Sequence, residues 1–212
     1  MGEASIFLTR MLDVLCDGGD RMAFAHDRRS MTYRAAYEKL RHLHDMLKTE
    51  GVTPGRSVAI IGGNVPERIL LQIAAQLRGA RVVHLESTDV LDDLAPDHVF
   101  SADLEGPLLP EHNGSSASEV DIALPRSVET IFPADDGFVS YGETYEQLAR
   151  ESRPDPDHAE RVLLIAPISH PVGNRIACKT LLSGDTVVIH ENTAEEVLSV
   201  PQESESELSR PV

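Results

Sequence analysis

Hydrophobic and polar positions form their most regular pattern over residues 56–86. A continuous apolar run at 58–61 is followed by turn residues at 62–64, a stretch with helical spacing and a second apolar run at 82–85. Continuous runs of β-branched residues are typical of strands buried on both faces, and a helical crossover between two such strands makes them parallel. The pattern therefore predicts a strand–helix–strand unit.

The helix of this unit carries start and stop signals. Asn64 is expected to cap its amino end, Pro66 lies in its first turn, where no amide partner is needed, and Gly79 is expected to end it. The pair Gly62-Gly63 lacks the spacing of a dinucleotide-binding loop, so we interpret it as a tight turn rather than a phosphate site.

A second stretch, 161–191, repeats this layout. It contains an Arg, a short apolar strand, a turn with Pro, a helix, a Gly, a Val-Val strand and a closing Glu. Two copies so far apart favour two similar α/β units over a solenoid. We therefore predict an α/β fold with two related lobes of mainly parallel sheet flanked by helices. The expected divisions are a first lobe at 1–103, an irregular linker at 104–126, a second lobe at 127–199 and a disordered acidic tail at 200–212.

Charge and composition narrow the class of protein. The net charge of -16 argues against nucleic acid as a partner, because phosphate binding needs a basic surface. We find neither a membrane-length apolar run nor the residue order of a signal peptide, so we predict no membrane association and a cytoplasmic location.

Cys16 and Cys178 lie in apolar helical patterns and are predicted to be buried thiols. The histidines lack metal-ligand spacing, so no metal site is expected.

Short motifs over residues 22–86 occur in an order known from one superfamily. They are T-Y at Thr32-Tyr33, G-V-x-P-G-R at 51–56, V-A-I-I at 58–61, N-x-P-E at 64–67, and Gly79-Ala80 followed by Val82-Val83. This order resembles the beginning of the adenylate-forming (AMP-dependent) synthetase and ligase superfamily, which includes acyl-CoA synthetases, peptide-synthetase adenylation domains and luciferases. The resemblance implies a shortened form of that family's N-terminal domain. Because these motifs are scaffold in the family, they indicate fold rather than activity.

The resemblance also implies a substrate site. Residues 167–173 are similar to the family's P-x-x-H-x-x-G segment, in which the His lines the acyl or aryl pocket. His170, Gly173 and Ser169 are therefore the expected substrate-binding residues, with an acyl or aryl acid as the ligand. A nucleophile and base at Ser169 and His170 is the other interpretation. We favour a pocket or core role, because adjacent side chains rarely face each other and no G-x-S-x-G surrounds the serine.

Two histidines form a second candidate site. His84 and His190 end the equivalent Val-Val strands of the two repeats. At the carboxyl ends of parallel strands they would lie at the usual ligand edge of a sheet. The alternative is that both are strand-end histidines that pack.

The family's phosphate loop is rich in Ser, Thr and Gly and ends in Pro-Lys-Gly. If Gly137 takes the place of the final Gly, Thr130 falls in the loop and Asp135 and Asp136 take the Pro-Lys positions. Two negative charges would then face a polyphosphate where a positive charge is expected. We predict a degenerate phosphate loop and assign no catalytic residue.

The resemblance places the family's ribose-binding Asp, hinge and catalytic-Lys lid beyond the end of this sequence, so adenylation by the chain alone is not expected. The first hypothesis is a truncated, inactive acyl- or aryl-CoA ligase-like protein that serves as a substrate-binding or protein-interaction module. The second is the N-terminal half of a split AMP-forming acid–CoA ligase completed by a partner chain. The third is a structural homodimeric module. No cofactor is expected, and ATP with Mg and CoA would bind only if a partner completes the chain.

Overall fold

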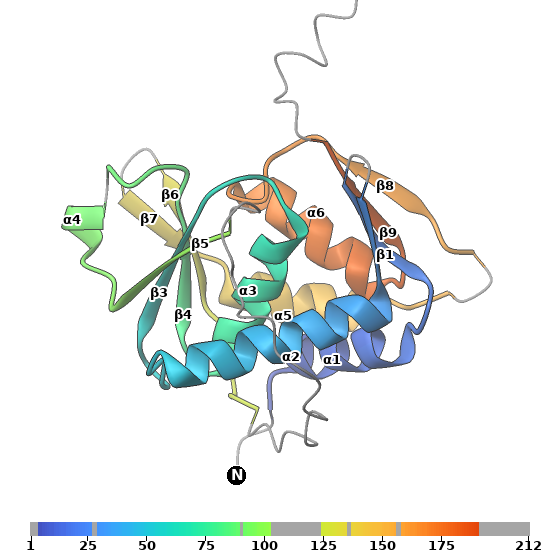
Figure 1. The fold of residues 1–212 in the computed structure, drawn as a ribbon, viewed down its shortest axis with the longest axis horizontal. Coiled ribbons are helices and arrows are strands. Elements are labelled where there is room, and N and C mark those ends of the chain that lie inside the picture. The colour runs from blue at the N-terminus through green and yellow to red at the C-terminus, as the bar shows by residue number, and fades with distance from the viewer. Residues whose placement is uncertain are drawn as a thin grey trace, which may run out of the picture.

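Two β-sheets enclose a layer of helices in this computed structural model, which describes residues 4–26, 29–89, 91–102, 124–134, 137–155 and 158–190 (Figure 1). Sheet A has the strand order β2-β1-β9-β8, and sheet B has the order β5-β3-β4-β6-β7. β2 pairs antiparallel with β1, and β7 pairs antiparallel with β6. The other pairings are parallel. The strands are β1 (Met22–His26), β2 (Arg29–Thr32), β3 (Ser57–Ile61), β4 (Arg81–His84), β5 (His98–Ser101), β6 (Thr130–Ala134), β7 (Gly137–Ser140), β8 (Arg161–Leu164) and β9 (Thr186–Ile189).

The larger helices lie between the two sheets, and a short helix lies outside sheet B (Figure 1). Their bounds are α1 (Ile6–Asp17), α2 (Tyr33–Thr49), α3 (Pro66–Leu77), α4 (Leu91–Leu94), α5 (Gly142–Glu151) and α6 (Pro171–Leu182). The predicted α/β class with mainly parallel sheets and flanking helices is confirmed. Among the described residues, no helix combines the length and the apolar character that crossing a membrane requires.

Both predicted strand–helix–strand units are present. The first is β3-α3-β4, in which Val58 pairs with Val82, and the second is β8-α6-β9, in which Val162 pairs with Val187. α3 is buried on nearly all sides: Glu67 is the one residue of this helix outside its buried set. This burial places α3 in the middle of the molecule rather than on the surface of one lobe.

The two sheets do not follow the order of the chain. β1 pairs in parallel with β9, with Phe24 opposite Val187, and β6 pairs in parallel with β4. The boundary expected at 104–126 therefore does not coincide with the division between sheets, because each sheet takes strands from both sides of it. A two-stranded hairpin is marginal alone, so the β1–β2 hairpin gains stability by joining β9 and β8. Most of the expected linker and the whole acidic tail lie outside the described residues.

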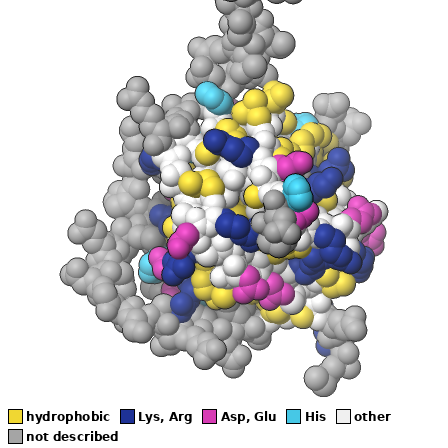
Figure 2. Space-filling model, turned by 90° about the vertical axis from the view of Figure 1, so that its right-hand side faces the viewer, with side chains coloured by type: hydrophobic (Ala, Val, Ile, Leu, Met, Phe, Trp, Pro, Cys, Tyr) yellow, Lys and Arg dark blue, Asp and Glu magenta, His cyan; other side chains and the backbone are white. Residues whose placement is uncertain are grey.

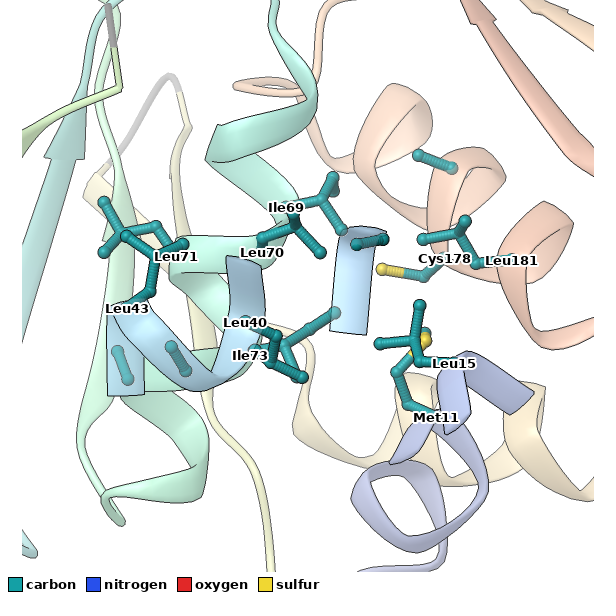
Figure 3. Packing of buried hydrophobic residues seen from close by; sticks show 14 of the residues in the cluster. Met11, Leu15, Leu40, Leu43, Ile69, Leu70, Leu71, Ile73, Cys178 and Leu181 are labelled. Carbon is teal, nitrogen blue, oxygen red and sulfur yellow. The ribbon is translucent and has the colours of Figure 1, made fainter. Parts of the chain in front are cut away.

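The hydrophobic core lies where the helices meet between the sheets. Figure 3 shows Leu40 and Leu43 of α2 next to the apolar side chains of α3, with Met11 and Leu15 of α1 close to Cys178 of α6. These residues belong to one contiguous cluster of buried side chains. Helices from both repeats are therefore buried in the same core.

Two local predictions need correction. Asn64 does not cap α3: the N-cap residue is Val65, without a side-chain hydrogen bond, and the Asn64 side chain bonds to the second repeat instead. Cys16 is exposed, although Cys178 is buried as predicted, because Cys16 lies on the solvent side of α1. One histidine of α2, His44, is buried with only 4% of its surface exposed.

A carboxylate from α5 caps α1 across the molecule. Glu146 Oε2 accepts hydrogen bonds from the backbone amides of Ile6, at 2.9 Å, and Phe7, at 3.3 Å. Its Oε1 accepts one from Ser5 Oγ at 2.5 Å. A negative charge at the amino end of a helix satisfies free amides and interacts favourably with the helix dipole.

Replacing this carboxylate should loosen the contact between α1 and α5. We expect Glu146→Ala to lower the free energy of unfolding by about 1–3 kcal/mol, because two amides and a hydroxyl lose their acceptor. Urea unfolding followed by circular dichroism measures this change. Glu38→Ala, at an exposed position of α2, is the matched control, and equal midpoints for the two variants would contradict the proposed cap.

Candidate functional site

The turns that follow β3, β4 and β8 are joined by hydrogen bonds. Asn64 Oδ1, after β3, accepts from the backbone amide of Ile168, after β8, at 2.9 Å. Ser169 Oγ donates to Glu86 Oε1, after β4, at 3.2 Å. The carboxyl ends of strands from the two sheets therefore meet here, which is where α/β proteins commonly bind ligands.

The segment expected to bind substrate starts α6. His170 is exposed, and its Nδ1 accepts from the backbone amide of Val172 at 3.2 Å, so the imidazole caps the helix. Ser169 is buried and bonded to Glu86. A role for either residue in substrate binding stays a prediction.

Gly173 packs directly against the backbone of the preceding turn. A Cβ atom at this position would overlap the carbonyl oxygens of Pro167 and Ala166. Gly173 is therefore required for the close approach of α6 to this turn.

His84 and His190 occupy different surroundings. His84 ends β4 in sheet B and is fully buried. Its Nδ1 accepts from Arg68 Nε at 3.2 Å, its Nε2 lies 2.8 Å from Gln72 Oε1, and its ring stacks on Phe132 with centroids 5.1 Å apart. These partners place the ring proton on Nε2. His190 follows β9 in sheet A and is exposed. His84 thus fits the alternative of a packed strand-end histidine, and the two do not form one site.

Burial lowers the pKa of His84 well below its usual value, and the nearby Arg68 guanidinium lowers it further. The imidazole is therefore neutral at pH 7. A neutral ring that donates to an amide oxygen and accepts from a guanidinium is a structural element here, with no path to a ligand among its described contacts.

Arg68 covers the carboxyl ends of β3 and β4. Its guanidinium donates to the carbonyl oxygens of Ile60, at 3.0 Å, and Leu85, at 2.6 Å, and also to the carbonyl of Gly62. Only 1% of its surface is exposed. The edge of sheet B between these two strands is therefore filled by a side chain of the protein itself.

The polar contacts continue from His84 into the helix layer. Asn174 Nδ2 of α6 donates to Gln72 Oε1 at 2.7 Å, and the Tyr145 hydroxyl of α5 donates to Asn174 Oδ1. Gln76 Nε2 donates to Thr130 Oγ1 of β6 at 2.7 Å. We call this set the buried polar cluster. Its members are Arg68, Gln72, Gln76, His84, Thr130, Tyr145 and Asn174, each at most 1% exposed.

Our sequence interpretation missed this cluster, although a signal for it exists. Arg68, Gln72 and Gln76 follow one another at intervals of four in an otherwise apolar helix. Polar residues at that spacing share one helix face, and a buried helix leaves them no solvent. Together they indicate a polar partner on the neighbouring elements.

The segment aligned with the phosphate loop is a hairpin. Ile131 pairs with Ser140, and Ala134 pairs with Gly137, so only two residues connect β6 to β7. The Thr130 hydroxyl is buried and bonded to Gln76, and therefore does not reach solvent. Asp135 and Asp136 lie outside the described residues. The described part of this segment pairs as an antiparallel ladder, and a degenerate phosphate loop stays a prediction.

Comparisons with known proteins agree with the two-sheet fold described above. A family model for AMP-binding enzymes matches residues 16–95. The 3-oxocholest-4-en-26-oate–CoA ligase of Rhodococcus rhodochrous is 29% identical over 149 residues, which make up 67% of this chain and 26% of that enzyme. An artificially fused adenylation–PCP di-domain, NpsA-ThdA from Klebsiella oxytoca, has a TM-score of 0.69 at 20% identity, covering 89% of this chain and 38% of that one. The Klebsiella oxytoca NpsA N-terminal subdomain in complex with 3-hydroxybenzoyl-AMSN has a TM-score of 0.67 at 20% identity, covering 86% of this chain and 53% of that one.

The fold is thus that of the N-terminal domain of adenylation and ligase enzymes. The family-model match and the CoA-ligase relative agree with it. They confirm the predicted relationship of this chain to the adenylate-forming (AMP-dependent) synthetase and ligase superfamily. The chain spans 26% of the length of the Rhodococcus enzyme. The activity in that enzyme's name therefore describes that enzyme and is not assigned to this chain by the match.

Burial of a neutral His84 makes stability depend on pH. The unfolded chain takes up a proton near pH 6.5, whereas the folded chain does not until a lower pH. The free energy of unfolding should therefore fall as the pH drops below about 6.5, by up to about 1.4 kcal/mol per pH unit from this group. Buried His44, whose pKa is also lowered by burial and by Arg78, adds to the effect.

Urea unfolding of His84→Gln at several pH values tests this linkage. The variant should show a shallower slope than the wild type between about pH 7.5 and pH 5.5, with about one proton fewer taken up on unfolding. His42→Gln, at an exposed position of α2, should keep the wild-type slope. Identical slopes for wild type and His84→Gln would show that His84 is protonated in the folded state.

Gly173 should tolerate no side chain. We expect Gly173→Ala to lower the free energy of unfolding by about 1–3 kcal/mol, because the added Cβ must displace the backbone at residues 166 and 167. Val172→Ala, at a half-exposed neighbouring position, should change it by less than about 0.5 kcal/mol. Thermal and urea unfolding measure both, and an unchanged midpoint for Gly173→Ala would disprove the close approach.

Proposed function

We propose that this chain is an acyl- or aryl-acid ligase-like protein that does not activate acids by itself and works as a protein-interaction module. The observation that carries the first part is the hairpin formed by β6 and β7. Phosphate binding needs free amides or hydroxyls around the anion. In this segment the two strands pair with each other across the hairpin, and the Thr130 hydroxyl is bonded to Gln76.

Interaction with a protein is better supported than binding of an acid. In the segment expected to hold the acid, Gly173 packs against the backbone and Ser169 is bonded to Glu86. His170 Nδ1 accepts from the first turn of α6. Because these groups already have structural partners, an acid pocket at this place would need them to rearrange.

The outer face of sheet A supplies an apolar surface. Leu163 is 50% exposed and Ile165 is 64% exposed, and Val188 pairs with Leu163 on the next strand. Figure 2, which views this side of the molecule, shows hydrophobic side chains gathered on its upper part with basic and histidine side chains among them. Parallel strands are normally covered on both faces. Exposed apolar patches of this kind mark interaction surfaces.

A split ligase is the second candidate function. The same uncovered face favours it, because a partner polypeptide that carries helices would cover sheet A and supply the remaining machinery of an AMP-forming acid–CoA ligase. ATP with Mg and CoA would then be bound by the complex. A purely structural homodimer is the third candidate, in which a second copy covers this face.

We expect the isolated chain to show no saturable heat with ATP and Mg²⁺ in isothermal titration and no pyrophosphate exchange with acyl or aryl acids. Micromolar ATP binding by the chain alone would overturn the proposal. Exchange that appears only with a co-purified partner, and is lost in Leu163→Asp, would establish the split ligase. A dimer by light scattering that Leu163→Asp converts to a monomer would establish the structural homodimer.

A further inference from the structure

A cavity lies between the β1–β2 hairpin and the first turn of α3. Its volume is about 130 Å³. None of the residues expected to bind substrate lines it. The residues that line it are Phe24, His26, Arg29, Ser30, Met31, Pro66 and Glu67.

Glu67 brings a carboxylate to the wall of this cavity. Its Oε2 is enclosed and has no hydrogen-bond partner among the described residues. The neighbouring Arg68 points to the other side of the helix, where it bonds to the ends of β3 and β4. Enclosed carboxylate oxygens nearly always accept hydrogen bonds. Because Oε2 is closed off from water-sized groups, a donor in the cavity would reach the carboxylate through its other oxygen or after rotation of the Glu67 side chain.

Arg29 lines the same cavity from the first position of β2 and carries a positive charge. Among the described residues, no hydrogen bond or ion pair joins Arg29 to Glu67. Two opposite charges that line one cavity without touching can each bind one end of a ligand that carries both charges. The hydroxyl of Ser30 adds a further hydrogen-bonding group beside Arg29.

The volume of the cavity and its apolar lining residues are compatible with a small ligand. A volume of about 130 Å³ is below the roughly 300–1,000 Å³ typical of pockets for drug-sized ligands, which limits the occupant to a small molecule. Phe24, Met31 and Pro66 supply apolar surface for a short carbon spacer. Small-molecule sites commonly combine apolar walls with a few placed polar groups.

We propose that this cavity binds a small zwitterion, with its ammonium on Glu67 and its carboxylate on Arg29 and Ser30. The site is independent of the proposed protein-interaction role and of the segment at residues 167–173. It gives the β1–β2 hairpin and α3 a shared ligand, so that occupancy would tighten the contact between sheet A and the helix layer.

Binding can be measured by titrating the ¹⁵N-labelled chain with β-alanine at neutral pH and low salt. β-Alanine should shift the amide signals of residues 24–31 and 67 in a saturable way. Glu67→Gln and Arg29→Gln should each weaken its binding about tenfold or more. Methylammonium should bind more weakly than β-alanine and should be sensitive to Glu67→Gln but not to Arg29→Gln. Acetate should show the opposite pattern.

Glu143→Gln is the matched control, because Glu143 is also an acidic residue in the first turn of a helix. It should bind β-alanine as the wild type does. Thermal unfolding checks that each variant is folded. Because Arg29 is exposed, Arg29→Gln should fold as the wild type does, and it keeps the test decisive if Glu67→Gln does not fold. Absence of saturable shifts with β-alanine, or binding that Arg29→Gln leaves unchanged, overturns the proposal.

Discussion

The arrangement of this molecule depends on hydrogen bonds to polar side chains of a central helix that are buried away from water. α3 is buried on nearly all sides, yet it carries Arg68, Gln72 and Gln76. Removing such groups from water is costly unless each finds a partner. The partners come from β4, β6 and α6. Since β4 and β6 belong to sheet B and α6 to the second repeat, one hydrogen-bonded cluster joins sheet B to helices from both repeats.

Much of this fold could be predicted from local pattern. The continuous runs at 58–61 and 82–85 gave a parallel pair of strands, and the resemblance of 161–191 to 56–86 gave the second unit. The pairing of β1 with β9 could not be predicted in this way. Strand partners are chosen by the packing of distant elements, and short apolar runs carry little information about which neighbour they join. The lobes expected from chain order therefore differ from the observed sheets.

The positions of the candidate residues in the fold could be predicted, but their surroundings could not. The turn at 167–173 does lie at strand ends, and His84 does end its strand. Whether a strand-end side chain faces a ligand depends on what fills the space beside it. Arg68 fills that space at β3 and β4, and the backbone at Pro167 fills it beside Gly173. The role of this segment in substrate binding stays a prediction, because a short motif does not show which side chains pack beside it.

The pairing of β1 with β9 bears on how the chain folds during synthesis. β1 leaves the ribosome early, but its parallel neighbour β9 ends at Ile189. Sheet A is therefore incomplete until almost the whole described chain has emerged, and the β1–β2 hairpin must wait with one edge unpaired. Long-range pairings of this kind slow folding and leave an edge open to other chains. The nascent protein would need its early helices, or a chaperone, to shield that edge.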